Sequence, residues 1–153
     1  MKKVYDSFIA TLKARNWNYD EGTDDRGNRK ITLGVRGDDL PMRFVIRFDE
    51  SRKLVVFHSF MNFEFGPEKR VEGALACCMI NYNIVNGAFD YDISDGSVLF
   101  RMVCPVHDTV PGQETFDYMI NCSCSTIDQY NDKLLAISKG YMSLDEFNAE
   151  IHS

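Results

Sequence analysis

A chain of 153 residues is long enough for one domain with its own core, and short for two domains of ordinary size. Its 44% hydrophobic and 26% charged residues are typical of a globular domain that folds without a disulfide or metal. The formal net charge of −6 repels phosphate, which argues against nucleic acid as a partner. We therefore expect residues 1–153 to form a single domain.

The amino-terminal segment resembles a secretory signal only in its first three residues. Asp6, Ser7 and Lys13 interrupt the apolar stretch that follows, so there is no continuous hydrophobic region. No run approaches the roughly 18 apolar residues that a membrane span requires. The five cysteines lack the spacing of a disulfide framework, as expected of reduced thiols. These features predict a cytoplasmic protein with no membrane partner.

The first half of the chain predicts one helix followed by four strands. Apolar residues recur at helical spacing from Val4 to Leu12. A first strand is expected to begin at 17–19, and alternating apolar residues predict strands at 31–35 and 42–48. The segment 54–60 is apolar on both faces, which indicates a central or doubly covered strand. The turns between the last three strands are too short for a crossover helix, so these strands should pair antiparallel.

The second half predicts a helix, a hairpin and two more helices. Pro67 is suited to the first turn of a helix. Alternation around a turn at 94–96 predicts a hairpin over 88–102. A long apolar stripe indicates a helix at 116–137, and a capping-box pattern at 143–146 begins a short last helix. The order α-β-β-β-β-α-β-β-α-α predicts an α+β fold with an antiparallel sheet and helices packed mainly on one face.

The helix that ends near residue 85 carries more apolar surface than one contact with a sheet requires. The stripe that we expect to pack on the sheet consists of Val71, Leu75, Cys78, Tyr82 and Val85. Apolar residues elsewhere on this helix then need cover, either from the 116–137 helix or from a second subunit. The candidate residues for a protein partner or a homodimer interface are Val55, Phe57, Cys77, Met79, Ile80 and Ile84.

Side chains that could bind a metal or catalyse a reaction show no local pattern. The cysteines stand adjacent, alternate or alone, and no histidine has a second ligand at helical spacing. The segment 90–96 resembles a calcium loop but lacks the closing glutamate, so a hairpin turn explains it better. We therefore expect structural thiols, no metal and no cofactor.

Two arginines on one predicted strand are the candidate for anion binding. Arg43 and Arg47 lie two pleats apart on the same face, where a solvated strand surface is the alternative interpretation. With His58 and Arg101 they could also form the site of a small-ligand binder or an enzyme. No triad of nucleophile, base and acid is marked locally.

The chain resembles the YbjN-type family, proposed to be bacterial sensory transduction regulators and related in fold to type III secretion chaperones. The segments that carry the resemblance are 43–48, 54–57, 74–83, 87–92, 95–101, 127–140 and 143–146. The resemblance implies an α+β domain that is frequently dimeric and has no known catalytic residues. Chaperones of this fold hold an extended segment of a partner protein on their surface.

These features favour a non-catalytic binding protein, either a regulator or a chaperone-like adaptor, over an enzyme. We expect a homodimer with a protein or peptide partner. A flat apolar surface and a symmetric interface would support this interpretation. A deep polar pocket with converging charged groups would support the alternative, a small-ligand binder or enzyme with its site on the sheet.

Overall fold

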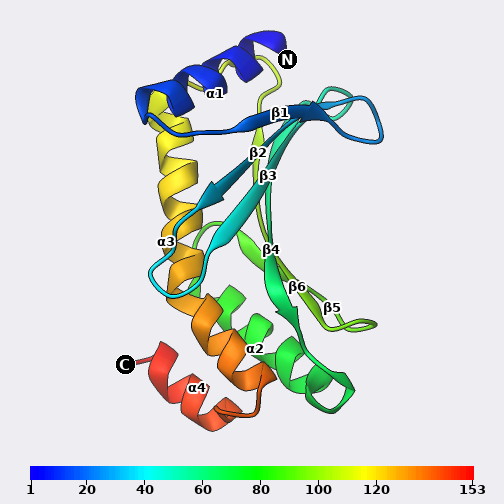
Figure 1. The fold of residues 1–153 in the computed structure, drawn as a ribbon, viewed down its shortest axis with the longest axis vertical. Coiled ribbons are helices and arrows are strands. Elements are labelled where there is room, and N and C mark those ends of the chain that lie inside the picture. The colour runs from blue at the N-terminus through cyan, green and yellow to red at the C-terminus, as the bar shows by residue number, and fades with distance from the viewer.

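A computed structural model describes residues 1–153 and contains four α-helices, one 3-10 turn and six strands (Figure 1). The helical elements are α1 (Lys2–Ala14), η1 (Pro67–Lys69), α2 (Arg70–Asn83), α3 (Gln113–Ser138) and α4 (Leu144–Ile151). The strands are β1 (Asp20–Thr23), β2 (Arg29–Val35), β3 (Met42–Asp49), β4 (Leu54–Glu64), β5 (Ala88–Asp92) and β6 (Ser97–Pro105). The α+β class and the predicted order of elements are confirmed, although the first strand begins at Asp20 rather than at 17–19.

All six strands form one antiparallel sheet in the order β1-β2-β3-β4-β6-β5. The prediction that β2, β3 and β4 are sequential antiparallel neighbours is confirmed. β4 lies inside the sheet between β3 and β6, which agrees with its apolar character. Val55 and Phe57 face the helices and are fully buried, and Val56 on the opposite face is only 7% exposed.

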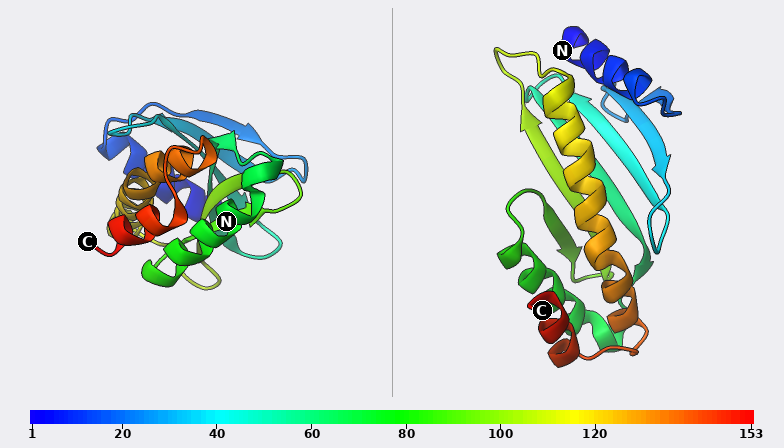
Figure 2. Two further views of the ribbon diagram at one scale, coloured as in Figure 1. Left: turned by 90° about the horizontal axis from the view of Figure 1, so that it is seen from below. Right: turned by 90° about the vertical axis from the view of Figure 1, so that its left-hand side faces the viewer.

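The helices lie on one face of the sheet (Figures 1 and 2). α3 runs along this face, α1 crosses it at one end of the molecule, and α2 and α4 lie at the other end. Phe8 of α1 is completely buried and makes edge-to-face contacts with Phe48, Phe57 and Phe116. One aromatic side chain of α1 thereby contacts two central strands and α3, which fixes α1 on the core.

The orientation of α2 differs from the prediction. The stripe that was expected to pack on the sheet faces solvent, and the residues that face the core are Gly73, Ala76, Cys77 and Ile80. The reason is the close approach of α2 to neighbouring aromatic side chains. A Cβ atom at Gly73 would lie 2.6 Å from the ring of Phe65 and 2.7 Å from the Tyr91 hydroxyl, so only small residues fit there.

The six residues expected to contact a partner belong to the chain's own core. Val55, Phe57, Cys77 and Ile80 are at most 2% exposed, and Met79 and Ile84 are half-buried. The residues of α2 and its end are covered from β5, α3 and α4, which all contact α2, and Val55 and Phe57 on β4 are covered from α3 and α1. Within one chain these side chains already have the cover that a second subunit was expected to provide.

Candidate functional site

Two surfaces stand out, and the first is the solvent-facing stripe of α2. Val71, Leu75, Tyr82 and Val85 are exposed by 65%, 48%, 90% and 95%, and Cys78 between them is exposed as well. These five residues are called the α2 stripe below; the first four lie on α2, and Val85 follows the helix after the extended residue Ile84. Isolated exposed apolar residues are normal, but a row of them along a helix and its end marks a site for a partner.

The second surface is the face of the sheet that carries no helix. A row of charged side chains crosses it from β3 to β5. Arg47 Nη1 donates to Nδ1 of His58 at 3.1 Å, and Arg101 lies directly opposite His58 on the neighbouring strand. Arg101 in turn forms a two-point ion pair with Asp90, at 2.6 and 3.1 Å. Arg47, His58 and Arg101 are therefore neighbours, which brings together three of the four residues proposed for a small-ligand or enzyme site.

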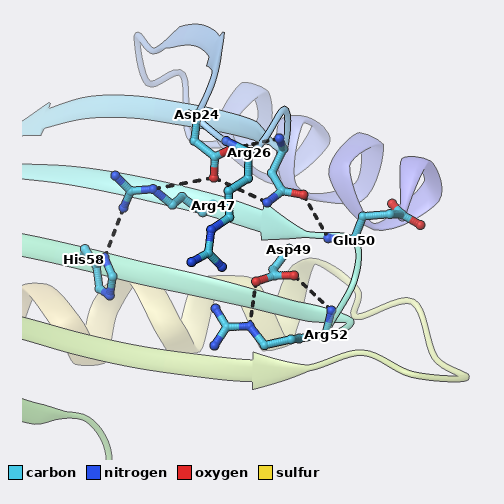
Figure 3. A network of polar contacts seen from close by, with 8 residues as sticks. Asp24, Arg26, Arg47, Asp49, Glu50, Arg52 and His58 are labelled. Atoms are coloured by element: carbon cyan, nitrogen blue, oxygen red, sulfur yellow. Dashed lines mark hydrogen bonds and ion pairs between the residues drawn. The ribbon is translucent and has the colours of Figure 1, made fainter.

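A pocket of about 350 Å³ opens at one end of this row. It lies between the β1–β2 turn and the outer face of β3 and β4, and the Arg26 side chain reaches from the turn over the sheet (Figure 3). Its lining residues are Asp24, Asp25, Arg26, Asn28, Lys30, Arg47, Asp49, Arg52, Val56 and His58. Only one of these side chains is apolar, so the pocket is suited to a charged ligand.

Two carboxylates of the pocket are committed to local structure. Asp24 Oδ1 accepts hydrogen bonds from the backbone N–H groups of Arg26 and Asn28, both at 2.9 Å, and so closes the β1–β2 turn. Burial alone would raise the pKa of Asp24, but these hydrogen bonds hold it below its usual value. Arg47 Nε stands 3.9 Å from Asp24 Oδ2, which is a loose ion pair.

Asp49 has the stronger set of partners. The backbone N–H of Arg52 donates to it at 2.9 Å, the Arg52 guanidinium at 2.7 Å and the Ser51 hydroxyl at 2.9 Å (Figure 3). The N–H and then the guanidinium of Arg52 lower the pKa of Asp49 to about 2. Asp49 is 4% exposed and remains ionised at neutral pH.

We expect replacement of Asp49 by asparagine to destabilise the protein by about 1.5–3 kcal/mol, because hydrogen bonds to a buried charge are lost. A depressed pKa contributes stability above the unfolded value of 3.8 that is lost as the pH falls towards about 2. Urea unfolding of the wild type should therefore show decreasing stability over this pH range, and Asp49→Asn should reduce that dependence.

The matched control is Glu50→Gln, which removes the neighbouring carboxylate from an exposed pair with Lys53. Exposed pairs contribute little, so we expect no measurable change in stability. Equal stability of Asp49→Asn and Glu50→Gln at neutral pH would contradict the structural role of Asp49.

His58 is held in its neutral form. Burial and then the Arg47 guanidinium lower the pKa of His58, with an opposing effect from Asp90 and a further lowering effect from Arg101. Because an arginine side chain only donates, Nδ1 of His58 must accept from Arg47. The proton of the neutral ring is then on Nε2, where it is available as a donor.

The predicted anion site is only partly found in this pocket. Arg47 lines it, but Arg43 lies opposite Gly34 in the first half of β3 and does not. Four strand positions separate the two arginines, which places their Cα atoms roughly 13 Å apart. Arg26 and Lys30 line the pocket as well and were not among the predicted site residues.

Two further features concern clusters of metal ligands and helices that could span a membrane. Nowhere do three or more His, Cys, Asp or Glu side chains gather as a metal site would require. None of the helices combines the length and apolar character needed to cross a bilayer.

The comparisons with known proteins agree with the resemblance seen in the sequence. Residues 5–136 match the YbjN family, described as "putative bacterial sensory transduction regulator", and the chain belongs to this family. The crystal structure of "YbjN, a putative transcription regulator from E. coli" has a similar fold, with a TM-score of 0.61. It is 14% identical, and the match covers 89% of this chain and 93% of that one. No curated protein matches the sequence.

The family prediction is thus confirmed, and with it the assignment to a group of proposed bacterial regulators. At 14% identity the likeness to the E. coli protein concerns the fold and not the site. The relation to type III secretion chaperones stays a prediction.

Proposed function

We propose that the protein is a non-catalytic regulator that works in the bacterial cytoplasm as a homodimer and binds a protein partner, as a regulator or chaperone-like adaptor does. The observation that carries the proposal is the α2 stripe, which is apolar, continuous and exposed. We assign this stripe to a second copy of the chain.

The spacing of the α2 stripe favours another helix as its contact. Its four helical residues, Val71, Leu75, Cys78 and Tyr82, are separated by four, three and four positions, which is the heptad spacing of paired helices. A helix that packs only on its own core has no need of a second seam on its solvent side. Two copies of α2 related by a two-fold axis would present identical stripes to each other.

The charge distribution also favours self-association here. Each chain carries a net charge of −6, so two copies repel each other over most of their surfaces. Residues 73–88, however, contain no charged side chain. Leu75, Cys78, Tyr82 and Val85 of the α2 stripe belong to this uncharged segment, and Val71 lies between Arg70 and Glu72, whose charges are opposite. Burial of each large apolar side chain contributes about 1.5–3 kcal/mol before the costs of association.

Two further observations support the absence of catalysis and the cytoplasmic location. None of the residues that line the pocket on the sheet carries a hydroxyl or a thiol, so His58 has no such nucleophile beside it. All five cysteines are free thiols, as is usual in a reducing compartment.

The dimer can be tested with charges placed in the α2 stripe. We expect the wild type to sediment as a dimer, and Leu75→Glu and Tyr82→Glu to sediment as monomers at about 100 µM. Each substitution would bury two carboxylates in the dimer interface, one from each subunit. Both positions face solvent in the isolated chain, so the variants should keep their fold, as circular dichroism would check.

The control is Val110→Glu, which adds the same charge at an apolar side chain that is 50% exposed and lies outside α2. It should remain a dimer. A monomeric wild type at high micromolar concentration, or a dimer that tolerates both stripe variants, would contradict the assignment of the α2 stripe to a second copy.

A further inference from the structure

We propose that the pocket between the β1–β2 turn and the outer face of β3 and β4 binds the diphosphate group of a small molecule. The proposal rests on an excess of cationic donors that the protein itself leaves unpaired. It is independent of the α2 stripe, which lies on another element.

The charge of the pocket is opposite to that of the chain. Four cationic side chains line it against three carboxylates, which gives the pocket a net charge of +1 in a protein of −6. Asp24 and Asp49 are already saturated by hydrogen bonds from the protein. The free charge that a ligand meets is therefore positive.

Two of the cations have no carboxylate partner. Arg26 extends from the β1–β2 turn over the sheet, and its guanidinium forms no ion pair (Figure 3). Lys30, on β2, forms none either, whereas Arg52 is occupied by Asp49. Arg26 from the turn and Lys30 from β2 therefore both line the pocket with donors that no carboxylate of the protein occupies.

The register of β2 and β3 places two cations side by side. Lys30 lies directly opposite Arg47 on the same open face, an arrangement of like charges that favours a bound anion. Arg47 contacts Asp24 only loosely, at 3.9 Å, and Lys30 forms no ion pair. An anion bound between Lys30 and Arg47 would neutralise both cations.

The size and the donors select the class of ligand. A pocket of about 350 Å³ exceeds what a single monatomic ion needs and falls in the range of small-molecule sites. Arginine recognises phosphate with two parallel donors, and lysine adds a point charge. His58 and the apolar side chain of Val56 complete the lining. These groups match the several oxygens of a diphosphate.

Titration calorimetry on the full chain at fixed ionic strength would test the proposal, with inorganic pyrophosphate and ADP as probes. We expect saturable binding of at least one probe, weakened about tenfold to a hundredfold by Arg26→Ala and by Lys30→Gln. Tighter binding of ADP would indicate a nucleotide-like ligand, and equal binding would indicate recognition of the diphosphate alone. Lys30 has no ion pair within the protein, so the melting temperature of Lys30→Gln should not fall.

The matched control is Arg43→Gln, which removes an exposed arginine from the same face of β3 outside the pocket and should leave binding unchanged. A second measurement is the NMR titration of His58. A bound diphosphate should raise its pKa against the effects of Arg47 and Arg101, while Asp90, Asp24, Arg26 and Lys30 provide the fixed surroundings.

The proposal is overturned if neither probe binds saturably up to about 10 mM, if Arg43→Gln weakens binding as much as Lys30→Gln, or if a phosphoserine peptide binds more tightly than both probes. None of these results depends on whether the chain is a dimer, so the ligand site and the proposed function can fail separately.

Discussion

Replacement of Phe8 by alanine should lower the free energy of unfolding by about 3–5 kcal/mol, the usual cost of removing a buried aromatic side chain. Phe8 is completely buried, and its ring centroid lies 5.0 Å from that of Phe116, 5.6 Å from that of Phe57 and 5.7 Å from that of Phe48. The cavity left in Phe8→Ala would separate α1 from α3 and from two strands at once. Urea unfolding followed by circular dichroism would measure the loss.

The control for Phe8→Ala is Phe60→Ala. Phe60 belongs to β4 but points to the uncovered face and is 57% exposed, so its removal should cost about 0.5 kcal/mol or less. The same chemical change would then have effects that differ several-fold according to the face of the sheet. Similar losses in both variants would mean that α1 does not pack on the core as described.

Replacement of Gly96 by alanine should cost about 2–5 kcal/mol, because two penalties act together. Gly96 has φ +76° in the β5–β6 turn, a conformation that L-residues adopt at a cost. Its Cβ would also overlap the backbone carbonyl oxygen of Phe65, which cannot move aside like a flexible side chain. The Phe65 N–H donates to the Gly96 carbonyl at 2.9 Å, so the clash would strain this contact as well.

Gly27→Ala is the control that separates the conformational cost from the steric cost. Gly27 has almost the same backbone conformation as Gly96, φ +80°, but a Cβ there would meet nothing within 4 Å. Gly27→Ala should therefore cost only the conformational part, about 1–2 kcal/mol. Thermal unfolding of the two variants would give the steric part as their difference. Equal melting temperatures would show that the turn at Gly96 does not pack against Phe65.

Much of the sheet could be predicted because alternation and short turns are local signals. The turn near Asp38 already implies the register that places Leu33 beside Phe44 and Lys30 beside Arg47. That register was the signal that could have added Lys30 to the candidate site. Arg26 gave no such signal, because the fold of the β1–β2 turn over the sheet depends on contacts of Asp24 that its spacing does not reveal.

The orientation of α2 could not be predicted from hydropathy because this helix is apolar on all sides in its middle. Residue size mattered at one position. Gly73 faces inward because Phe65 and Tyr91 leave no room for a larger side chain there, so Ala76, Cys77 and Ile80 face the core while Leu75 and Tyr82 remain outside. The glycine inside the helix was the available signal for this close packing.

The long axis of the molecule separates the two proposed sites. The pocket lies near the β3–β4 turn, at the end where α1 crosses the sheet, and α2 lies at the other end beside α4 (Figure 1). A dimer joined through α2 would thus keep both pockets away from the shared interface. Each pocket would stay open to solvent and would fill independently of the other.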